Sequence, residues 1–439
     1  MNRITWRYLG CIFSGLLWSL LIIWTNLWYL LLFNLVIFDL FITRKIDWTL
    51  RKYGLPRAIQ SVIEWLAIFT LAITSSLIIK VLFVEVYKIP TPSMEETLLA
   101  GDFIFVSKLS YGPRLPGTPL AIPFYHNKLP SGKKSYSEKI SMPHKRLWGF
   151  SSVKRNDIIV FNFPEGDTMV VEYPGQNYYS LVRQYGRDYI LSEFDIITHP
   201  VDKRENYVKR CIGLPGDTLQ IIDGEIFINA DERPTLPKQK FKYYVTTTGN
   251  PLPDILLDSL KIHKSSVTYN PVNSLHVLFL AEENLKSLRS YPTVRSIKRY
   301  SEPMLSFQNQ EIFPHSHYFR WTGDNYGPIK VPARGDTIPI NTLNLLLYQR
   351  IIEVYEQNEL VEKNGDIYIN GELADTYPIK MDYYFVMGDN QHNSADSRYW
   401  GFVPEDHLLG KAVTVWFSIE PDKSILDGLR KERIFSSIK

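Results

Sequence analysis

The stretch Tyr87–Val106, YKIPTPSMEETLLAGDFIFV, joins an apolar segment to the rest of the chain and decides how that rest is organised. The residues before it, Val62–Val84, are almost continuously apolar and long enough to cross a bilayer, which takes ~20 residues. Ser93 therefore emerges within roughly ten residues of one membrane face. Pro90 and Pro92 favour extended backbone, so they end the helix and present the hydroxyl on a stiff segment. Read alone, the stretch is also typical of a serine that caps a membrane helix.

The composition excludes several kinds of partner and site. The 439 residues predict roughly two or three domains, and 45% hydrophobic and 14% aromatic residues are enough for a sizeable core. The net charge of +3 is small and the basic residues are scattered, which argues against nucleic acid as a partner. Cys11 lies in an apolar run and Cys211 in a strand-like segment, so we expect no structural disulfide. Since no histidine cluster or CxxC has ligand spacing, no metal site is predicted.

A first apolar stretch, Tyr8–Ile42, is too long for a cleavable signal segment and should remain as an anchor. As one helix it would measure about 50 Å, more than a ~30 Å hydrocarbon core. It either overhangs into the interface or breaks near Thr25-Asn26 into two segments, and the sequence leaves both open. The loop that follows carries Arg44, Lys45, Arg51, Lys52 and Arg57 against the single acid Asp47. By the positive-inside rule this loop is cytoplasmic, so the second span delivers all later residues to the outer face.

The pattern after the second span changes to short apolar runs separated by Gly, Pro, Asn and Asp, which predicts a β-rich region. The strands that we expect are Phe103–Val106, Asp157–Phe163, Tyr207–Ile212, Asp382–Met387 and Ala412–Ile419.

Two similar segments, 223–231 and 364–372, each join a turn dipeptide to an apolar strand and a second turn, which is typical of β-hairpins. Chance recurrence explains their similarity as well as a duplication does. They bracket a polar insertion that contains an amphipathic helix over Leu343–Glu359. Pro113–Phe150 and Pro164–Arg204 are rich in Pro, Lys, Tyr and Ser and predict further surface loops.

Ser93 needs a base, because a hydroxyl near its free pKa is a poor nucleophile. None of the nine histidines lies in a recognisable nucleophile-base pattern. Lys209 is the better candidate, since strand alternation places it on the same apolar face as Tyr207 and Cys211. Burial there would lower the lysine pKa, and only a neutral amine accepts a proton from serine. By itself, a Lys-Arg pair on a strand is typical of solvated surface.

Four sequence blocks taken together favour Ser93 as a nucleophile over a helix-capping serine, and Lys209 as a base over a solvated surface lysine. They are Pro92–Leu98 with Gly101-Asp102, Asn156–Phe161, Val208–Asp217 and Gly388–Pro404. In this order the blocks closely resemble the bacterial type I signal peptidases, membrane-bound Ser/Lys endopeptidases that remove signal peptides from exported proteins. Gly323–Asn325 copies the start of the last block without the rest, and we interpret it as a loop.

The resemblance implies a role for each matched residue. Ser93 is implied as the nucleophile and Lys209 as its general base. Thr91 falls where the family places a hydroxyl that helps the Ser93 amide bind the oxyanion. The residues implied to orient the lysine and brace the site are Ser394, Asp389, Asp396, Arg398 and Arg210. Those implied to line the pockets for small substrate residues are Ile89, Ile104 and Val208. The departures from the family pattern are Glu96, where many members have proline, and Gln391-His392 in the variable centre of the last block; neither removes a reacting group.

The implied protein is a membrane-bound serine endopeptidase that acts on signal-peptide-bearing preproteins without cofactor, metal or nucleic acid. Its catalytic domain would lie on the extracytoplasmic face of a bacterial cytoplasmic membrane. The implied fold is mainly β, with N-terminal transmembrane helices and a catalytic core that carries a smaller inserted subdomain. The expected parts are a membrane anchor with a basic loop (1–61), a transmembrane helix (62–84), the first part of the core (85–233), the inserted subdomain (234–363) and the second part of the core with the tail (364–439).

One alternative belongs to another class, and a second is a different kind of enzyme. A catalytically dead, β-rich binding or scaffold protein would not need both Ser93 and Lys209. An acyl enzyme of the penicillin-binding or β-lactamase type would need a lysine three residues after the serine, where this chain has Glu96.

Overall fold

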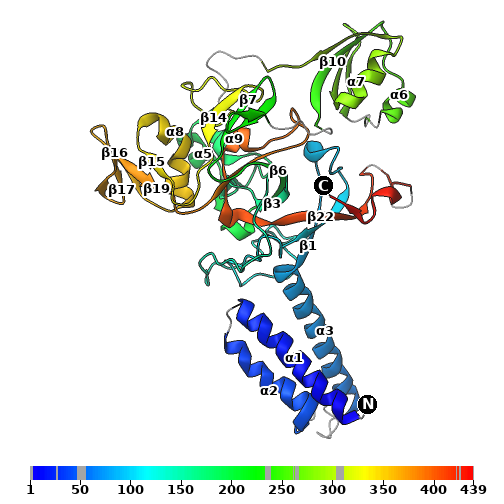
Figure 1. The fold of residues 1–439 in the computed structure, drawn as a ribbon, viewed down its shortest axis with the longest axis vertical. Coiled ribbons are helices and arrows are strands. Elements are labelled where there is room, and N and C mark those ends of the chain that lie inside the picture. Colours follow the sequence, from blue (N-terminus) through cyan, green and yellow to red (C-terminus); the bar gives the residue numbers. More distant parts are fainter. Residues whose placement is uncertain are drawn as a thin grey trace.

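The structure is a computed structural model that describes residues 3–25, 28–46, 56–232, 239–260, 262, 266–302, 311–421, 423–424 and 427–438. Figure 1 shows a helical N-terminal part at one end of the molecule, a strand-rich body above it, and a small separate sheet beyond the body. The fold class predicted from the sequence, mainly β with N-terminal apolar helices, is confirmed.

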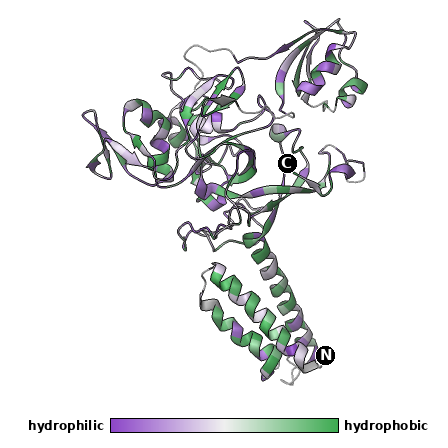
Figure 2. Ribbon diagram, viewed as in Figure 1, coloured by the Kyte–Doolittle hydropathy of each residue, from purple (hydrophilic) through white to green (hydrophobic). Residues whose placement is uncertain are grey.

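The N-terminal part contains two helices that are long and apolar enough to cross a membrane, α1 (Arg3–Thr25) and α3 (Arg57–Leu82). Between them the chain returns through η1 (Trp28–Leu32), α2 (Phe33–Phe38) and η2 (Asp39–Thr43). Figure 2 shows the apolar character of α1, of the return segment and of α3. Of the two alternatives for the first apolar stretch, the structure has the broken one, since α1 ends at Thr25 and packs on the return segment through Trp18 and Phe33. Within the predicted basic loop, residues 47–55, which include Asp47, Arg51 and Lys52, lie outside the described residues.

The central sheet is antiparallel and has the order β1-β2-β22-β3-β6-β20-β21, with β23 beside β22. Its strands are β1 (Val84–Lys88), β2 (Asp102–Ser107), β3 (Ile158–Asn162), β6 (Asn206–Gly213), β20 (Tyr383–Met387), β21 (Val403–Pro404), β22 (Leu408–Ser418) and β23 (Ser436–Ser437). All five predicted strands are present in this sheet. It joins segments from both ends of the soluble region, so the two parts of the core form one body.

Both predicted hairpins are confirmed, and each continues into a third short strand. The first is β7 (Thr218–Ile222), β8 (Glu225–Ile228) and β9 (Asp231–Glu232), and the second is β16 (Leu360–Lys363), β17 (Asp366–Ile369) and β18 (Glu372–Leu373). Asp223 and Asn364 take left-handed backbone conformations, φ 50° and 57°, in the tight turns that join the first two strands of each hairpin.

The range 234–363, expected as one inserted subdomain, divides between two hydrophobic cores. Its first part forms a separate sheet, β11-β12-β10-β13, with its own apolar cluster. The elements of this cap sheet, as we call it, are β10 (Phe241–Thr247), α6 (Asp254–Ser259), β11 (Thr268–Asn270), β12 (Leu275–Leu280), α7 (Glu282–Arg289) and β13 (Val294–Arg299).

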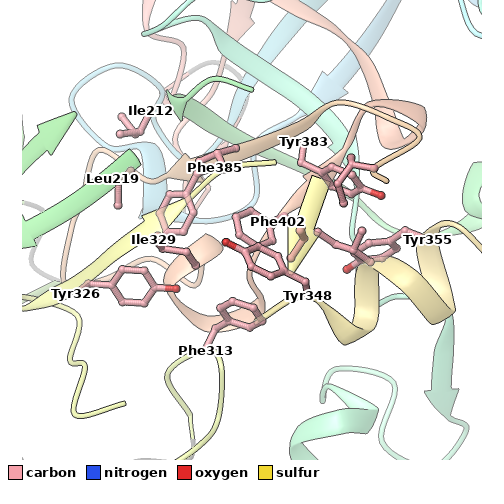
Figure 3. Packing of buried hydrophobic residues seen from close by; sticks show 14 of the residues in the cluster. Ile212, Leu219, Phe313, Tyr326, Ile329, Tyr348, Tyr355, Tyr383, Phe385 and Phe402 are labelled. Carbon is pink, nitrogen blue, oxygen red and sulfur yellow. The ribbon is translucent and has the colours of Figure 1, made fainter. Parts of the chain in front are cut away.

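The later part of the same range packs on the main body. Strand β14 (Tyr326–Lys330) pairs with β7, and β15 (Thr337–Pro339) pairs with β19 (Thr376–Pro378). Helix α8 (Thr342–Arg350) and its extension η7 (Ile351–Tyr355) correspond to the predicted amphipathic helix. Figure 3 shows Tyr348 and Tyr355 from this helix in the same cluster as Phe385 and Phe402, so burial against the body holds this part in place.

The two predicted surface loops differ from each other. Pro113–Phe150 has only isolated bridges, such as Arg114 to Arg146, within its described residues. The prediction of a loop over 164–204 is wrong, because this range folds into a small unit around Val170, Leu181 and Ile190. Its elements are β4 (Thr168–Val170), α4 (Tyr178–Tyr185), α5 (Arg187–Glu193), β5 (Ile196–Thr198) and η5 (Val201–Lys203).

Candidate active site

Ser93 and Lys209 meet where the sheet curls on itself. Ser93 lies in the single turn η4 (Pro92–Met94) that follows β1, and Lys209 lies in β6. Lys209 Nζ donates a hydrogen bond to Ser93 Oγ at 2.7 Å. The two residues are only 4% and 8% exposed, so the contact is shielded from bulk water. As alternation predicts, Lys209 shares its face with Tyr207, whose ring centre lies 6.0 Å from Nζ.

The surroundings of Lys209 favour its neutral form. Burial lowers the pKa of Lys209 to about 8, although the carboxylates of Asp396 and Asp389 oppose this shift and Arg398 adds to it. With a pKa of about 8, roughly one lysine in ten is uncharged at pH 7, far more than for an ordinary lysine, and the uncharged amine can accept a proton.

Thr91 lies on the other side of the serine hydroxyl. Its Oγ1 is 3.3 Å from Ser93 Oγ, and its side chain is exposed. Pro92, between the two residues, has no N–H to donate. A side-chain hydroxyl and the Ser93 amide are therefore the hydrogen-bond donors that this turn offers near the nucleophile.

Four of the residues expected to brace the site form two buried ion pairs. Arg210 binds both carboxylate oxygens of Asp389 at 2.7 Å. Arg398 binds the two oxygens of Asp396 at 2.9 and 2.8 Å, and Asp396 also accepts the Gly388 N–H. The Arg210–Asp389 pair fixes the Gly388–Pro404 block against β6, and the Arg398–Asp396 pair braces the block internally, at the start of α9 (Ser397–Trp400).

Ser394 lies beside the serine turn. A Cβ built on Gly388 would come within 2.2 Å of Ser394 Oγ and 2.5 Å of the Ser93 carbonyl oxygen, so this close approach requires glycine. The hydroxyl of Ser394 has one long contact, 3.5 Å to the Ala395 carbonyl, and makes no hydrogen bond to Lys209 among the described residues. Its expected role in orienting the lysine stays a prediction.

The three expected pocket residues belong to one apolar cluster. Ile89 and Ile104 are buried there, and Val208 packs against them from β6. Strand alternation turns Val208 away from the Lys209 face. The structure therefore brings these residues together on the opposite face of β6 from the lysine.

Sequence reasoning missed four contacts of the serine loop. Thr97 Oγ1 donates to Asp389 at 2.6 Å and accepts from Arg210 at 3.0 Å. Lys240, just before the cap sheet, lies 3.5 Å from a Glu95 oxygen and 2.8 Å from a Glu96 oxygen. Thr97 lies within a matched block and could have been singled out, whereas Lys240 lies in a polar linker with no pattern of its own.

The Gly323–Asn325 loop also contacts the site, although no sequence pattern connects the two. Asp324 binds His392 Nε2 at 2.9 Å, and the Gly323 carbonyl accepts from Arg398 at 3.2 Å. His392 Nδ1 accepts the N–H of Lys242. No group of three or more metal-binding side chains occurs among the described residues.

Known proteins resemble most of the chain. The model of a family described as signal peptidase, peptidase S26, matches residues 62–325 and 329–417. A signal peptidase I from Buchnera aphidicola subsp. Acyrthosiphon pisum is 26% identical over 96% of this chain and 95% of its own length. The signal peptidase I of Buchnera aphidicola subsp. Baizongia pistaciae is 25% identical over 85% and 83%, and that of Haemophilus influenzae is 24% identical over 81% and 70%.

Proposed function

The chain belongs to the signal peptidase family, peptidase S26, and from this premise we propose that it cleaves signal peptides from exported preproteins with Ser93 and Lys209 as its catalytic pair. The observation that carries the proposal is the buried hydrogen bond from Lys209 Nζ to Ser93 Oγ. It connects a nucleophile to a base whose pKa is lowered to about 8 by burial. A serine with such a partner is activated for attack on a carbonyl.

The reaction is an acyl transfer in two stages. Neutral Lys209 takes the hydroxyl proton as Ser93 Oγ bonds to the scissile carbonyl carbon, and the carbonyl electrons move to its oxygen. When the tetrahedral intermediate collapses, the C–N bond breaks and the lysine gives its proton to the leaving nitrogen. Water, deprotonated by the same lysine, then hydrolyses the ester that remains on Ser93 and releases the signal peptide.

The oxyanion needs donors while it forms, and we assign this role to the Ser93 amide and the Thr91 hydroxyl. The 3.3 Å contact between Thr91 Oγ1 and Ser93 Oγ supports the assignment. The apolar cluster of Ile89, Ile104 and Val208 is suited to small side chains before the scissile bond. Asp389 joins Arg210 of β6 to Thr97 of the serine loop, and the Asp396–Arg398 pair braces the last block.

We assign the protein to a bacterial cytoplasmic membrane, with the catalytic body on the extracytoplasmic face. The apolar helices α1 and α3 support membrane anchoring. The excess of Arg and Lys between η2 and α3 supports a cytoplasmic loop there. A signal peptide is held in the same bilayer by its own apolar segment, so enzyme and substrate would meet in two dimensions.

The test is processing of a model preprotein by the detergent-solubilised protein and by its Ser93→Ala, Lys209→Ala and doubly substituted forms. We expect each single substitution to abolish cleavage, and the double substitution to be no worse, because the two residues act as a unit. Circular dichroism and thermal unfolding would show that the variants remain folded. Clear residual turnover by the Lys209→Ala form would show that another group is the base.

A further inference from the structure

A cavity of about 260 Å³ lies where α3 meets the catalytic body, at the junction of α3 and β1 that Figure 1 shows. Leu77 and Val81, four residues apart on one face of α3, form one side of it. The other sides come from β1, from residues 114–126 and from residues 202–206. At ~1.5 Å per residue α3 measures about 39 Å, more than a ~30 Å hydrocarbon core, so its last turns reach the level of the lipid headgroups. We call this cavity the junction pocket.

The junction pocket is separate from the site of the proposed reaction. Ile89, Ile104 and Val208, which are expected to receive small substrate residues, are not among the described residues of its wall, and neither is the proposed catalytic pair. Tyr87 lines the pocket and packs against the apolar cluster of those three residues. The pocket therefore lies beside that cluster, on the side of α3.

Positive charge is in excess in the wall of the junction pocket. The lysine and arginine side chains that line it are Lys80, Lys108, Arg114 and Lys203, and the carboxylates are Glu85 and Asp202. Burial lowers the pKa of Lys108 and of Lys203; the two carboxylates oppose these shifts, and the other two basic side chains add to them. An anion in the pocket would offset this repulsion, since buried charges are costly unless an opposite charge accompanies them.

The two carboxylates are already engaged with other groups. Glu85 pairs with Lys108 at 2.7 Å and with Lys80 at 3.1 Å, so that two lysines share one negative charge. Asp202 accepts the N–H and the hydroxyl of Thr118 at 3.0 and 2.7 Å, whereas the neighbouring lysine Nζ lies 3.9 Å away. The pocket therefore keeps a net positive charge and N–H donors of the kind that phosphate oxygens accept.

Part of the wall is apolar and faces outward. Ile122, Phe124 and Tyr125 line the pocket and are 47%, 64% and 43% exposed. Leu77 and Val81 add apolar surface from α3. A basic pocket bordered by apolar side chains at the end of a membrane helix matches an anionic phospholipid, whose headgroup is charged and whose chains are apolar.

We propose that the junction pocket binds the headgroup of an anionic phospholipid, with the phosphodiester on the lysine and arginine side chains and the acyl chains along Leu77 and Val81. The volume of about 260 Å³ is below the about 300–1,000 Å³ of pockets for drug-sized ligands, which suits a headgroup rather than a whole lipid. The inference rests on membrane anchoring through α3 and not on the proposed reaction. A lipid held there would tie the catalytic body to the membrane surface beside β1.

Native mass spectrometry of the detergent-solubilised full-length protein tests lipid binding without turnover. The probes are dioleoyl-phosphatidylglycerol, which is anionic, and dioleoyl-phosphatidylcholine, which has the same acyl chains and no net charge. We expect phosphatidylglycerol to bind roughly tenfold more tightly, or more. Equal affinities for the two lipids would overturn the proposal.

Removal of two lysine charges tests the location. Lys80 is partly exposed, and Asp202 keeps two other hydrogen bonds without Lys203, so Lys80→Gln/Lys203→Gln should remain folded, which circular dichroism checks. We expect this form to bind phosphatidylglycerol about tenfold more weakly and phosphatidylcholine as before. Lys133→Gln/Lys139→Gln makes the same change in charge at exposed positions outside the described wall, and should bind both lipids as the unmodified protein does. No loss in the first double variant, or an equal loss in both, would contradict the proposal.

The apolar part of the wall distinguishes a lipid from a soluble phosphate ester. Phe124→Ser should weaken the binding of phosphatidylglycerol severalfold and leave unchanged the weaker binding of glycerol phosphate, which has no acyl chains. Phe150→Ser, at a position that is 72% exposed and outside the described wall, is the control and should change neither. If glycerol phosphate bound the unmodified protein as tightly as phosphatidylglycerol does, the occupant would be a soluble phosphate ester and the assignment to a lipid would be wrong.

Discussion

At the scale of single residues, the mechanism that we propose depends on the neutral form of Lys209. Its pKa, lowered by burial to about 8, is the point below which the amine is mostly protonated and cannot act as a base. We therefore expect kcat/KM to fall about tenfold for each pH unit below this value and to level off above it. A pH profile measured with a preprotein substrate checks this. A flat profile between pH 5 and 9 would contradict a lysine base, provided that single-turnover kinetics show chemistry to be rate-limiting.

Thr91 gives a second prediction at this scale. If its hydroxyl completes the oxyanion hole, Thr91→Ala should lower kcat by roughly 10²- to 10³-fold, or about 3 to 4 kcal/mol, with little change in substrate binding. Thr91→Ser keeps the hydroxyl and should retain most activity, whereas Thr91→Val keeps the shape and should resemble alanine. If Thr91 only stiffens the turn through its β-branch, valine would be harmless and serine harmful. Steady-state kinetics of the Val and Ser variants decide between the two roles.

The pair that we propose to react could be singled out from the sequence because each member lies in a local pattern. Ser93 lies in a Pro-bracketed turn, and strand alternation gave Lys209 its apolar face. Asp324, Lys240 and Thr97 reach the site through contacts between distant parts of the chain, which no periodicity records. Local patterns thus pointed to the proposed catalytic pair but not to the residues that hold the pair in position.

At the scale of elements, too, local patterns could be predicted and contacts between distant segments could not. The strands of the central sheet and the two hairpins follow from alternation and turn dipeptides, which act over a few residues. The prediction of a loop over 164–204 failed because Pro, Gly and charged residues interrupt its apolar runs, and because α4 and α5 are short. These helices are stable only because they bury Leu181 and Ile190 against β4 and β5.

The junction between the cap sheet and the serine loop offers a prediction at this scale. Lys240 is 3% exposed and lies between Glu95 and Glu96, and its backbone bonds to Asp389 and Gln391 of the last block. Glu96 has φ 88°, which a proline ring cannot adopt, so the serine loop follows a path that proline at this position would not allow. Lys240 therefore holds together the two loops that carry Ser93 and Ser394.

Removing the charge of Lys240 should release these loops. We expect Lys240→Met to lower kcat at least tenfold and to destabilise the fold by about 3 kcal/mol or more, since it leaves two carboxylates without their buried partner. Lys298→Met, at an exposed position on β13 of the cap sheet, serves as the matched control and should change neither kcat nor the stability of the fold. The double form Lys240→Met/Glu96→Gln should recover part of the loss, because one uncompensated charge is gone. Strictly additive effects would rule out coupling between Lys240 and Glu96. Steady-state kinetics measure kcat, and thermal unfolding measures the stability of the fold.

At the scale of the whole molecule, contacts at the two ends of α1 fix how it lies relative to the other N-terminal helices and to the catalytic body. Trp24, near the end of α1, donates to the Trp148 carbonyl at 3.1 Å and packs near Phe83 at the end of α3. At the other end, Arg7 donates to the Phe41 carbonyl of the return segment. The start of α1 therefore lies with the end of η2, and the end of α1 lies with the catalytic body, as Figure 1 shows.

This arrangement predicts that the chain crosses the membrane three times, through α1, the return segment and α3. The start of α1 then lies on the same side of the membrane as the basic loop. The return segment Trp28–Thr43 would measure about 24 Å as a helix, somewhat less than a ~30 Å hydrocarbon core, so we expect local thinning of the bilayer around it.

The predicted topology can be checked with single cysteines introduced at Thr5, Lys45 and Val272 in a chain with Cys11→Ser; the remaining Cys211 is buried. A membrane-impermeant maleimide should label position 272, which is 94% exposed on the cap sheet, in intact spheroplasts. Positions 5 and 45 should react only after lysis. Labelling of position 45 before lysis would invert the orientation and remove exported preproteins as substrates, whereas labelling of position 5 alone would mean that α1 and the return segment do not cross as a pair.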